Sequence, residues 1–112
     1  MKLSSIQSSD EAGVSHNANI RKHVFIANGD INHITNLSRA VFPAGEIAKQ
    51  HQHMDMTEVF YIESGIGEIV VDGKKTVLQQ GMCITIDPHE QHELRNNGPT
   101  ELVVLCLGIK TS

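Results

Sequence analysis

The fold of this chain is decided by the segment from Gly45 to Gly65, which reads GEIAKQHQHMDMTEVFYIESG. Glycines bound the segment at both ends, and its interior holds short runs of Ile, Val, Phe and Tyr among polar residues. Runs of this kind are typical of β-strands, not of amphipathic helices. The segment therefore predicts two strands, over 46–53 and 58–63, joined by a short connection at 54–57.

The same pattern continues on both sides of this segment. Short runs rich in β-branched and aromatic residues are separated by turn signals at intervals of about eight to twelve residues, which is typical of an all-β sandwich or barrel. Asn28-Gly29 and Asp72-Gly73 each predict a two-residue hairpin turn. No stretch has the periodicity and the caps of a long helix, so little helix is expected. The expected strands are 20–26, 33–42, 46–53, 58–63, 66–71, 74–78, 82–86, 91–96 and 101–108, enough for a small barrel.

The length of 112 residues supports one domain. Residues 1–18 are rich in Ser, Asn and Asp and show no periodicity, so they predict a flexible N-terminal arm, and residues 19–112 form the expected barrel domain. The net charge is −4 and no basic run occurs, which argues against nucleic-acid binding. No apolar run approaches the roughly 20 residues that span a bilayer, and a secretory signal is not recognisable, so we expect no membrane partner and a cytoplasmic location. Cys83 and Cys106 lie in apolar runs and are expected to be buried free thiols.

Histidine is the over-represented residue, with seven in the chain. His51 and His53 lie two apart in an expected strand, which would place both side chains on one face. Glu58 follows after a short connection, and His92 lies on a later expected strand. Three imidazoles and one carboxylate suit a first-row transition metal better than Ca²⁺ or Mg²⁺. A His-x-His pair alone occurs more often without a metal, so this spacing by itself leaves a surface or core role open.

Glycines and an asparagine frame these four residues in two longer motifs. The pattern G-x5-H-x-H-x3-4-E-x6-G is matched at every fixed position between Gly45 and Gly65. A second pattern, G-x5-P-x-G-x2-H-x3-N, keeps its overall spacing but departs in its interior, where Pro88 comes one residue late and His89 replaces a glycine. Its matched positions are Gly81, His92 and Asn96. In these two motifs the chain resembles the cupin family, over roughly residues 37–104.

The resemblance implies an all-β fold, a small jelly-roll β-barrel, with one divalent transition-metal ion inside it. The implied ligands are His51, His53, Glu58 and His92, and the ion is Mn, Fe, Ni, Cu, Co or Zn. Proteins resembling this chain include dioxygenases, decarboxylases, isomerases and proteins with no known reaction. We expect a metal-dependent enzyme acting on a small chelating organic substrate, with dioxygenase-like oxidation ahead of isomerisation or decarboxylation. The alternative is a non-catalytic barrel that binds a metal or a small ligand.

Other residues are weaker candidates for the site. Arg39 could bind a substrate carboxylate from the strand before Gly45. Met56, Phe60 and Ile62 could line the pocket, although core packing explains the last two equally well. His89 could lie at the pocket mouth or face solvent. Finally, the exposed strand edges of a small barrel invite pairing between copies, so a homodimer is expected.

Overall fold

The structure is a computed structural model that describes residues 1–7, 11–14 (backbone only) and 17–111. These residues form ten β-strands and no helix, so none of them makes a helix able to cross a membrane. The strands are β1 (Glu11–Val14), β2 (Asn17–Ile26), β3 (Ile34–Phe42), β4 (Ile47–His51), β5 (Met56–Ser64), β6 (Ile66–Val71), β7 (Lys74–Gln79), β8 (Cys83–Ile86), β9 (His92–Arg95) and β10 (Leu102–Lys110).

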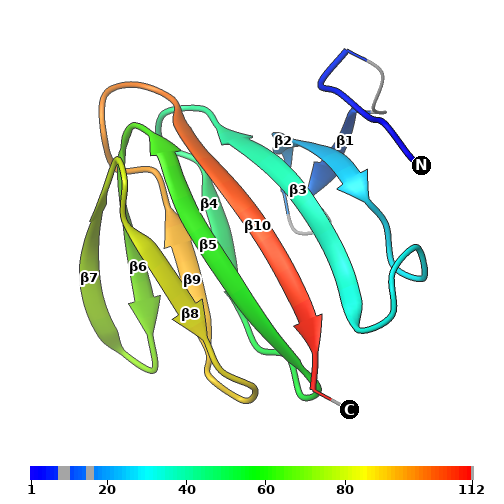
Figure 1. Cartoon of the computed structure of the whole chain (residues 1–112). Coiled ribbons are helices and arrows are strands. Elements are labelled where there is room, and N and C mark those ends of the chain that lie inside the picture. Colours follow the sequence, from blue (N-terminus) through cyan, green and yellow to red (C-terminus); the bar gives the residue numbers. More distant parts are fainter. Residues whose placement is uncertain (8–10, 15–16, 112) are drawn as a thin grey trace.

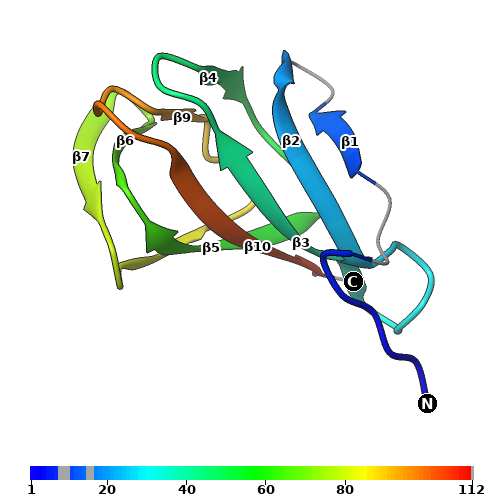
Figure 2. The ribbon, with the colours of Figure 1, turned by 90° about the horizontal axis from the view of Figure 1, so that it is seen from above.

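The strands form two antiparallel sheets (Figure 1). One has six strands in the order β1-β2-β3-β10-β5-β8, and the other has four in the order β4-β9-β6-β7. Seen from above, β4 and β9 lie across a common interior from β5 (Figure 2). The expected all-β jelly-roll fold is confirmed. Within the described residues, the hydrogen bonds run through two sheets and do not close one continuous cylinder.

All nine expected strands are present, with ends shifted by a few residues. The hairpin at Asp72-Gly73 is confirmed, because both residues have positive φ (48° and 83°) and join the paired ends of β6 and β7. The two-residue hairpin expected at Asn28-Gly29 is wrong. There the chain makes a longer connection over 27–33, in which the carboxylate of Asp30 accepts the Ala27 N–H at 3.0 Å.

The segment 1–18, expected as an arm, contributes to the six-stranded sheet. Strand β1 pairs with β2, and β2 itself begins at Asn17, whereas residues 8–10 and 15–16 lie outside the described residues. Near the start of the chain, Lys2 forms an ion pair with Asp30. The Ser4 hydroxyl donates to the backbone carbonyl of Phe25 at 3.4 Å. Two strands of the larger sheet therefore lie or begin within this segment.

Two residues of the motifs have structural roles, because they stabilise the backbone of the connections between strands. Gly65 has a φ of +90°, and an added Cβ there would lie 2.3 Å from the carbonyl oxygen of Glu101. Asn96 is buried, and its side-chain amide donates to the backbone carbonyls of Phe42 and Thr100 at 2.9 and 2.8 Å. Both residues hold the connections between the sheets in place.

The core lies between the two sheets, because alternate residues of each strand face inward. On β3 these are Ser38, Ala40 and Phe42, which are all buried. The apolar members of the core are Ile20, Ala40, Phe42, Ala48, Phe60, Ile62, Ile69, Leu78, Ile86, Leu94, Leu102 and Val104. Several members of this core, among them Phe42, Phe60 and Leu94, also line a cavity that polar inward-facing residues share.

Candidate metal centre

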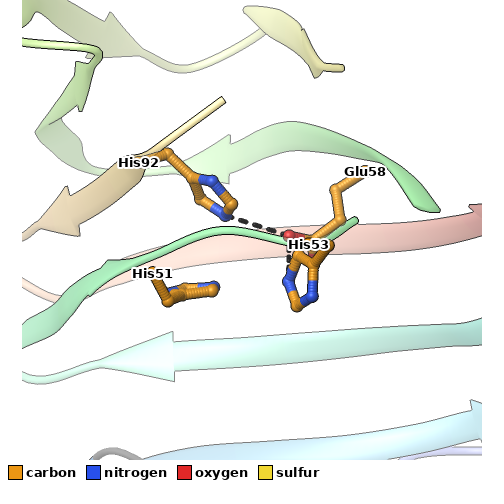
Figure 3. A group of neighbouring side chains, drawn as sticks. All are labelled: His51, His53, Glu58 and His92. Carbon is orange, nitrogen blue, oxygen red and sulfur yellow. Dashed lines mark hydrogen bonds and ion pairs between the residues drawn. The ribbon is translucent and has the colours of Figure 1, made fainter. Parts of the chain in front are cut away.

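The structure brings together the four residues that the two motifs single out (Figure 3). His51 ends β4, His53 follows it in a loop, Glu58 lies in β5 and His92 begins β9. One donor atom from each residue lies within 4.8 Å of the donors of the other three. Side chains from three strands and one loop thus converge on one point inside the fold.

A β-bulge in β4 turns His51 toward the interior. Ala48 pairs with Leu94 and His51 pairs with His92, so three residue steps on β4 match two on β9. Ala48 is buried, and with regular alternation Gln50 would be the next inward residue and His51 would face outward. The extra residue reverses this order, as bulges beside functional sites often do. His51 therefore faces His92, with ring centroids 4.3 Å apart.

His53 reaches the site from a loop. The expected strand over 46–53 ends at His51, so the expectation that both histidines share one face of a strand is wrong in this detail. A backbone hydrogen bond holds the loop, because the N–H of His89 donates to the carbonyl of His53 at 2.7 Å. His89 has a φ of +74° at the place where the second motif has glycine. Its side chain is exposed and contacts Met54, so it does not face the metal centre.

Backbone carbonyls orient two of the three imidazoles. The Nδ1 atom of His51 lies 2.8 Å from the carbonyl oxygen of Lys49, and that of His92 lies 3.1 Å from the carbonyl oxygen of Glu90. When each Nδ1 carries a proton, it donates to that carbonyl and leaves Nε2 as the acceptor nitrogen. This arrangement is the usual one for histidines that bind metals.

Glu58 contacts two of the imidazoles through one oxygen atom. Its Oε1 lies 2.9 Å from Nε2 of His53 and 3.0 Å from Nε2 of His92 (Figure 3). Two donors at right angles on one ion, each about 2.1 Å away, would lie about 3.0 Å apart. A modest adjustment of these side chains would therefore place an ion among them.

The charges in this cluster are coupled. Burial would raise the pKa of Glu58, but the hydrogen bond to His92 and the nearby imidazoles outweigh it and lower the pKa below 4.5. Burial likewise opposes the charge of His92, but the bonds to Glu58 and to the Glu90 carbonyl raise its pKa above 6.5. Burial lowers the pKa of His51. In the absence of an ion, the Glu58 carboxylate and the His92 imidazole therefore each favour the charged form of the other.

The donor set fits a transition-metal ion. Three neutral imidazole nitrogens and one carboxylate oxygen are borderline ligands, which suit Mn, Fe, Co, Ni, Cu or Zn, whereas Ca²⁺ and Mg²⁺ prefer oxygen. The side chains are half-buried apart from His92, which is 1% exposed. The cluster can therefore bind a metal ion that still meets molecules from solution.

A cavity of about 220 Å³ lies next to the four residues. Of the weaker candidates, Met56 and Phe60 line this cavity, whereas Ile62 is completely buried in the core. Arg39 does not line it, which corrects the expectation of a substrate clamp. Alternation along β3 places Arg39 on the outer face, where its guanidinium binds Glu63 through Nη2 at 2.8 Å. The remaining lining residues are Lys22, Asn36, Ser38, Ala40, Phe42, Ala48, Leu94 and Cys106.

Four polar lining residues were missed by the sequence analysis. Asn36 and Ser38 share the inward face of β3 with Ala40, so fixing the alternation of that strand would have found them. Cys106 packs against the core as expected, but it also borders the cavity. Lys22 gave no signal in the sequence. Cys83, by contrast, is exposed, so its expected burial is wrong.

Comparisons with known proteins agree on one family. The model of the cupin domain matches residues 38–108, which is more than half of the chain. An uncharacterized protein of Methanocaldococcus jannaschii is 33% identical over 70 residues. The match covers 62% of this chain and 56% of that protein, so the chain matches little more than half of its relative's length.

Solved structures with the same fold have more distant sequences. A Thermotoga maritima protein described as a predicted oxalate decarboxylase has a TM-score of 0.89 at 21% identity, covering 97% of this chain and 99% of that chain. Ectoine synthase from P. lautus has a TM-score of 0.82 at 20% identity, covering 98% and 78%. These likenesses show the fold alone. Together with the match of the family model, they establish that this chain belongs to the cupin family.

Proposed function

We propose that this protein is a metal-dependent enzyme acting on a small organic anion that chelates the ion. The single observation that carries the proposal is the convergence of His51, His53, Glu58 and His92 beside a cavity. With one carboxylate among its ligands, a divalent ion keeps a formal charge of about +1, which favours anionic chelators. A bound ion would supply Lewis-acid and, for a redox-active metal, electron-transfer chemistry.

The chain itself positions the substrate and limits water. Ala40, Phe42, Phe60 and Leu94 give the cavity an apolar wall, which strengthens electrostatic interactions inside it. The backbone carbonyls of Lys49 and Glu90 fix the rings of His51 and His92. These features would hold a small chelating acid in one orientation.

We place dioxygenase-like oxidation, with dioxygen as the second substrate, first among the possible reactions. Decarboxylation of a small acid is the second candidate, because a protein of the same fold is described as a predicted oxalate decarboxylase. A barrel that only binds a metal or ligand remains the alternative to an enzyme. We further propose that the protein works in the cytoplasm and as a homodimer.

The first experiment is elemental analysis of untagged protein purified without added metals or chelators. We expect close to one equivalent of a first-row transition metal. Iron, manganese or copper would favour the oxidative reaction and direct a screen of chelating acids for oxygen uptake. Metal without turnover of any such acid would favour the binding barrel, and no metal even after reconstitution would overturn the proposal.

Variants assign the metal to the cluster. We expect His51→Ala and His92→Ala to lose most of the metal while the β-type circular dichroism persists. His23→Ala is the matched control, because His23 pairs with Arg39 on the outer face of the sheet and should keep the metal. Metal retained by both cluster variants at the wild-type ratio would show that it binds elsewhere.

A further inference from the structure

A lysine lines the same cavity as the metal centre. Lys22 lies in β2 and pairs with Ala40 of β3, whose buried side chain also borders the cavity. Lys22 shares the inward face of β2 with the buried Ile20, two positions earlier. Its side chain is half-buried and lines the cavity from the six-stranded sheet. Three of the four metal-site residues lie in the four-stranded sheet or in the loop after β4.

Among the described residues, the structure gives the ammonium group of this lysine no anionic partner. In the part of the chain that the structure describes, no carboxylate forms an ion pair with Lys22, whereas Arg39 and Arg95 bind Glu63 and Glu68. A half-buried ammonium group without a counter-ion gives up hydration and gains no ion pair in return. An anion in the cavity would supply the missing partner.

Between Lys22 and the metal centre the cavity has a polar wall. Ser38 of β3 donates to the side-chain oxygen of Asn36 at 2.9 Å, and Cys106 lies opposite Ser38 on β10. Burial and the charge of Glu58 raise the pKa of Cys106 to about 12, while the charge of Lys22 acts in the other direction. The thiol therefore lies within electrostatic range of both the carboxylate of the metal centre and the ammonium group, and all three residues line the same cavity.

The cavity limits the size of the anion. About 220 Å³ is the room of roughly seven water molecules at about 30 Å³ each. An acid of about seven to ten non-hydrogen atoms fits such a space. That size is enough for a chelating group at one end and a second acidic group at the other.

We propose that the ligand of this cavity is a small dicarboxylic acid, with its chelating end at the metal centre and its second carboxylate on Lys22. The inference rests on the proposed function and adds the substrate class to it. Lys22 is then the residue that sets specificity, because a charge-assisted hydrogen bond to a carboxylate distinguishes a dicarboxylate from the matching monocarboxylate. Asn36 also lines the cavity, and its side-chain amide donates to Oγ1 of Thr35 at 3.4 Å.

The test compares three hydroxy acids by calorimetric titration into protein loaded with one equivalent of Mn²⁺ or Zn²⁺. Lactate chelates through its hydroxyl and carboxylate, whereas malate and 2-hydroxyglutarate add a second carboxylate at two distances. We expect at least one of these two to bind about tenfold more tightly than lactate. In Lys22→Met this preference should disappear while the affinity for lactate stays within about twofold, and Lys22→Arg should keep most of the preference.

The matched control is Lys75→Met, since Lys75 is exposed on β7, a strand that contributes no residue to the cavity lining. It should bind all three acids as the wild type does. Equal affinity of the wild type for lactate and both dicarboxylates would overturn the inference, and so would a preference that survives in Lys22→Met. Failure of the wild type to take up any metal would instead overturn the proposed function and remove the basis of this inference with it.

Discussion

At the scale of a single residue, Gly108 makes room for side chains that pack beside Glu58 of the metal centre. It lies on β10 between Asn36 of β3 and Glu58 of β5, its partners in the two neighbouring strands. An added Cβ would lie 2.0 Å from Oγ1 of Thr35 and 2.9 Å from Sδ of Met56. Only a residue without a side chain leaves these groups where they are, next to the carboxylate that faces the histidines.

Gly108→Ala should therefore weaken the metal site and the fold together. Overpacking of this kind costs about 1–3 kcal/mol of the free energy of unfolding. We also expect metal affinity to fall about tenfold, because Glu58 must shift with its neighbours. Chemical denaturation and metal titration measure the two effects. Adding Thr35→Ala removes the most crowded atom and should restore part of both losses, whereas a Gly108→Ala protein with unchanged affinity and stability would show that the contact relaxes freely.

The pair formed by His92 and Glu58 sets the pH dependence of metal binding. The pKa of His92 is raised above 6.5, since its bonds to Glu58 and to the Glu90 carbonyl outweigh its burial. A metal binds only the neutral imidazole, so the proton must leave first. The affinity for the metal should therefore begin to fall while the pH is still above 6.5. Titrations over a pH series, in buffers of different ionisation enthalpy, would count the released proton.

The metal-free protein should respond to pH in the opposite direction in this window. A raised pKa in the folded state means that the His92–Glu58 pair stabilises the fold fully below pH 6.5 and that this stabilisation is lost as pH rises through the folded pKa. Burial lowers the pKa of His51, so protonation of His51 destabilises the fold. That loss of stability occurs below pH 6.5. Thermal unfolding of the metal-free and metal-loaded protein should give slopes of opposite sign above pH 6.5, and parallel slopes would contradict the assignment.

At the scale of the element, the bulge in β4 keeps His51 in the site although three residue steps separate it from Ala48. Deleting Gln50 would leave two steps, as between Leu94 and His92 on β9, so regular alternation would still turn His51 inward. We expect the deletion variant to keep its β-type circular dichroism and most of its metal. Gln50→Ala keeps the number of residues and should also keep the metal. Loss of the metal from the deletion variant alone would show that the site needs the local backbone of the bulge and not only the inward direction of His51.

The sequence predicts the strands better than it predicts the direction in which individual side chains point. Val, Ile, Phe and Thr runs between turn signals predicted nine of the ten strands, and Asp72-Gly73 predicted its hairpin. Two motifs predicted which four residues meet. The pattern could not predict the bulge before His51, because alternation alone points that side chain outward. It also could not predict that Lys22 lines the cavity, because this depends on how β2 pairs with β3. Arg39 was misplaced for the same reason, since the alternation of β3 was not fixed.

At the scale of the whole molecule, the outer face of the six-stranded sheet is unusually apolar. Leu105 of β10 lies there between Arg39 of β3 and Tyr61 of β5, and Tyr61 is 41% exposed. Val59 and Leu107 form the next row. An antiparallel sheet with one face on the core normally presents polar residues on the other. A face of this kind is typical of an interface between proteins.

We expect two copies to pack through this face, because a two-fold axis would bury its apolar rows against each other and let Arg39 of one copy approach Glu63 of the other. A stable interface needs about 800 Å² per partner, roughly an eighth of the 6530 Å² accessible surface of the chain.

Light scattering after size exclusion should give the mass of a dimer for the wild type and of a monomer for Tyr61→Lys. Val77→Lys, on a more exposed position of the smaller sheet, should stay dimeric. A monomeric wild type at micromolar concentration would contradict the dimer, whereas a dimeric Tyr61→Lys protein would place the interface on another face, such as the exposed edge of β7.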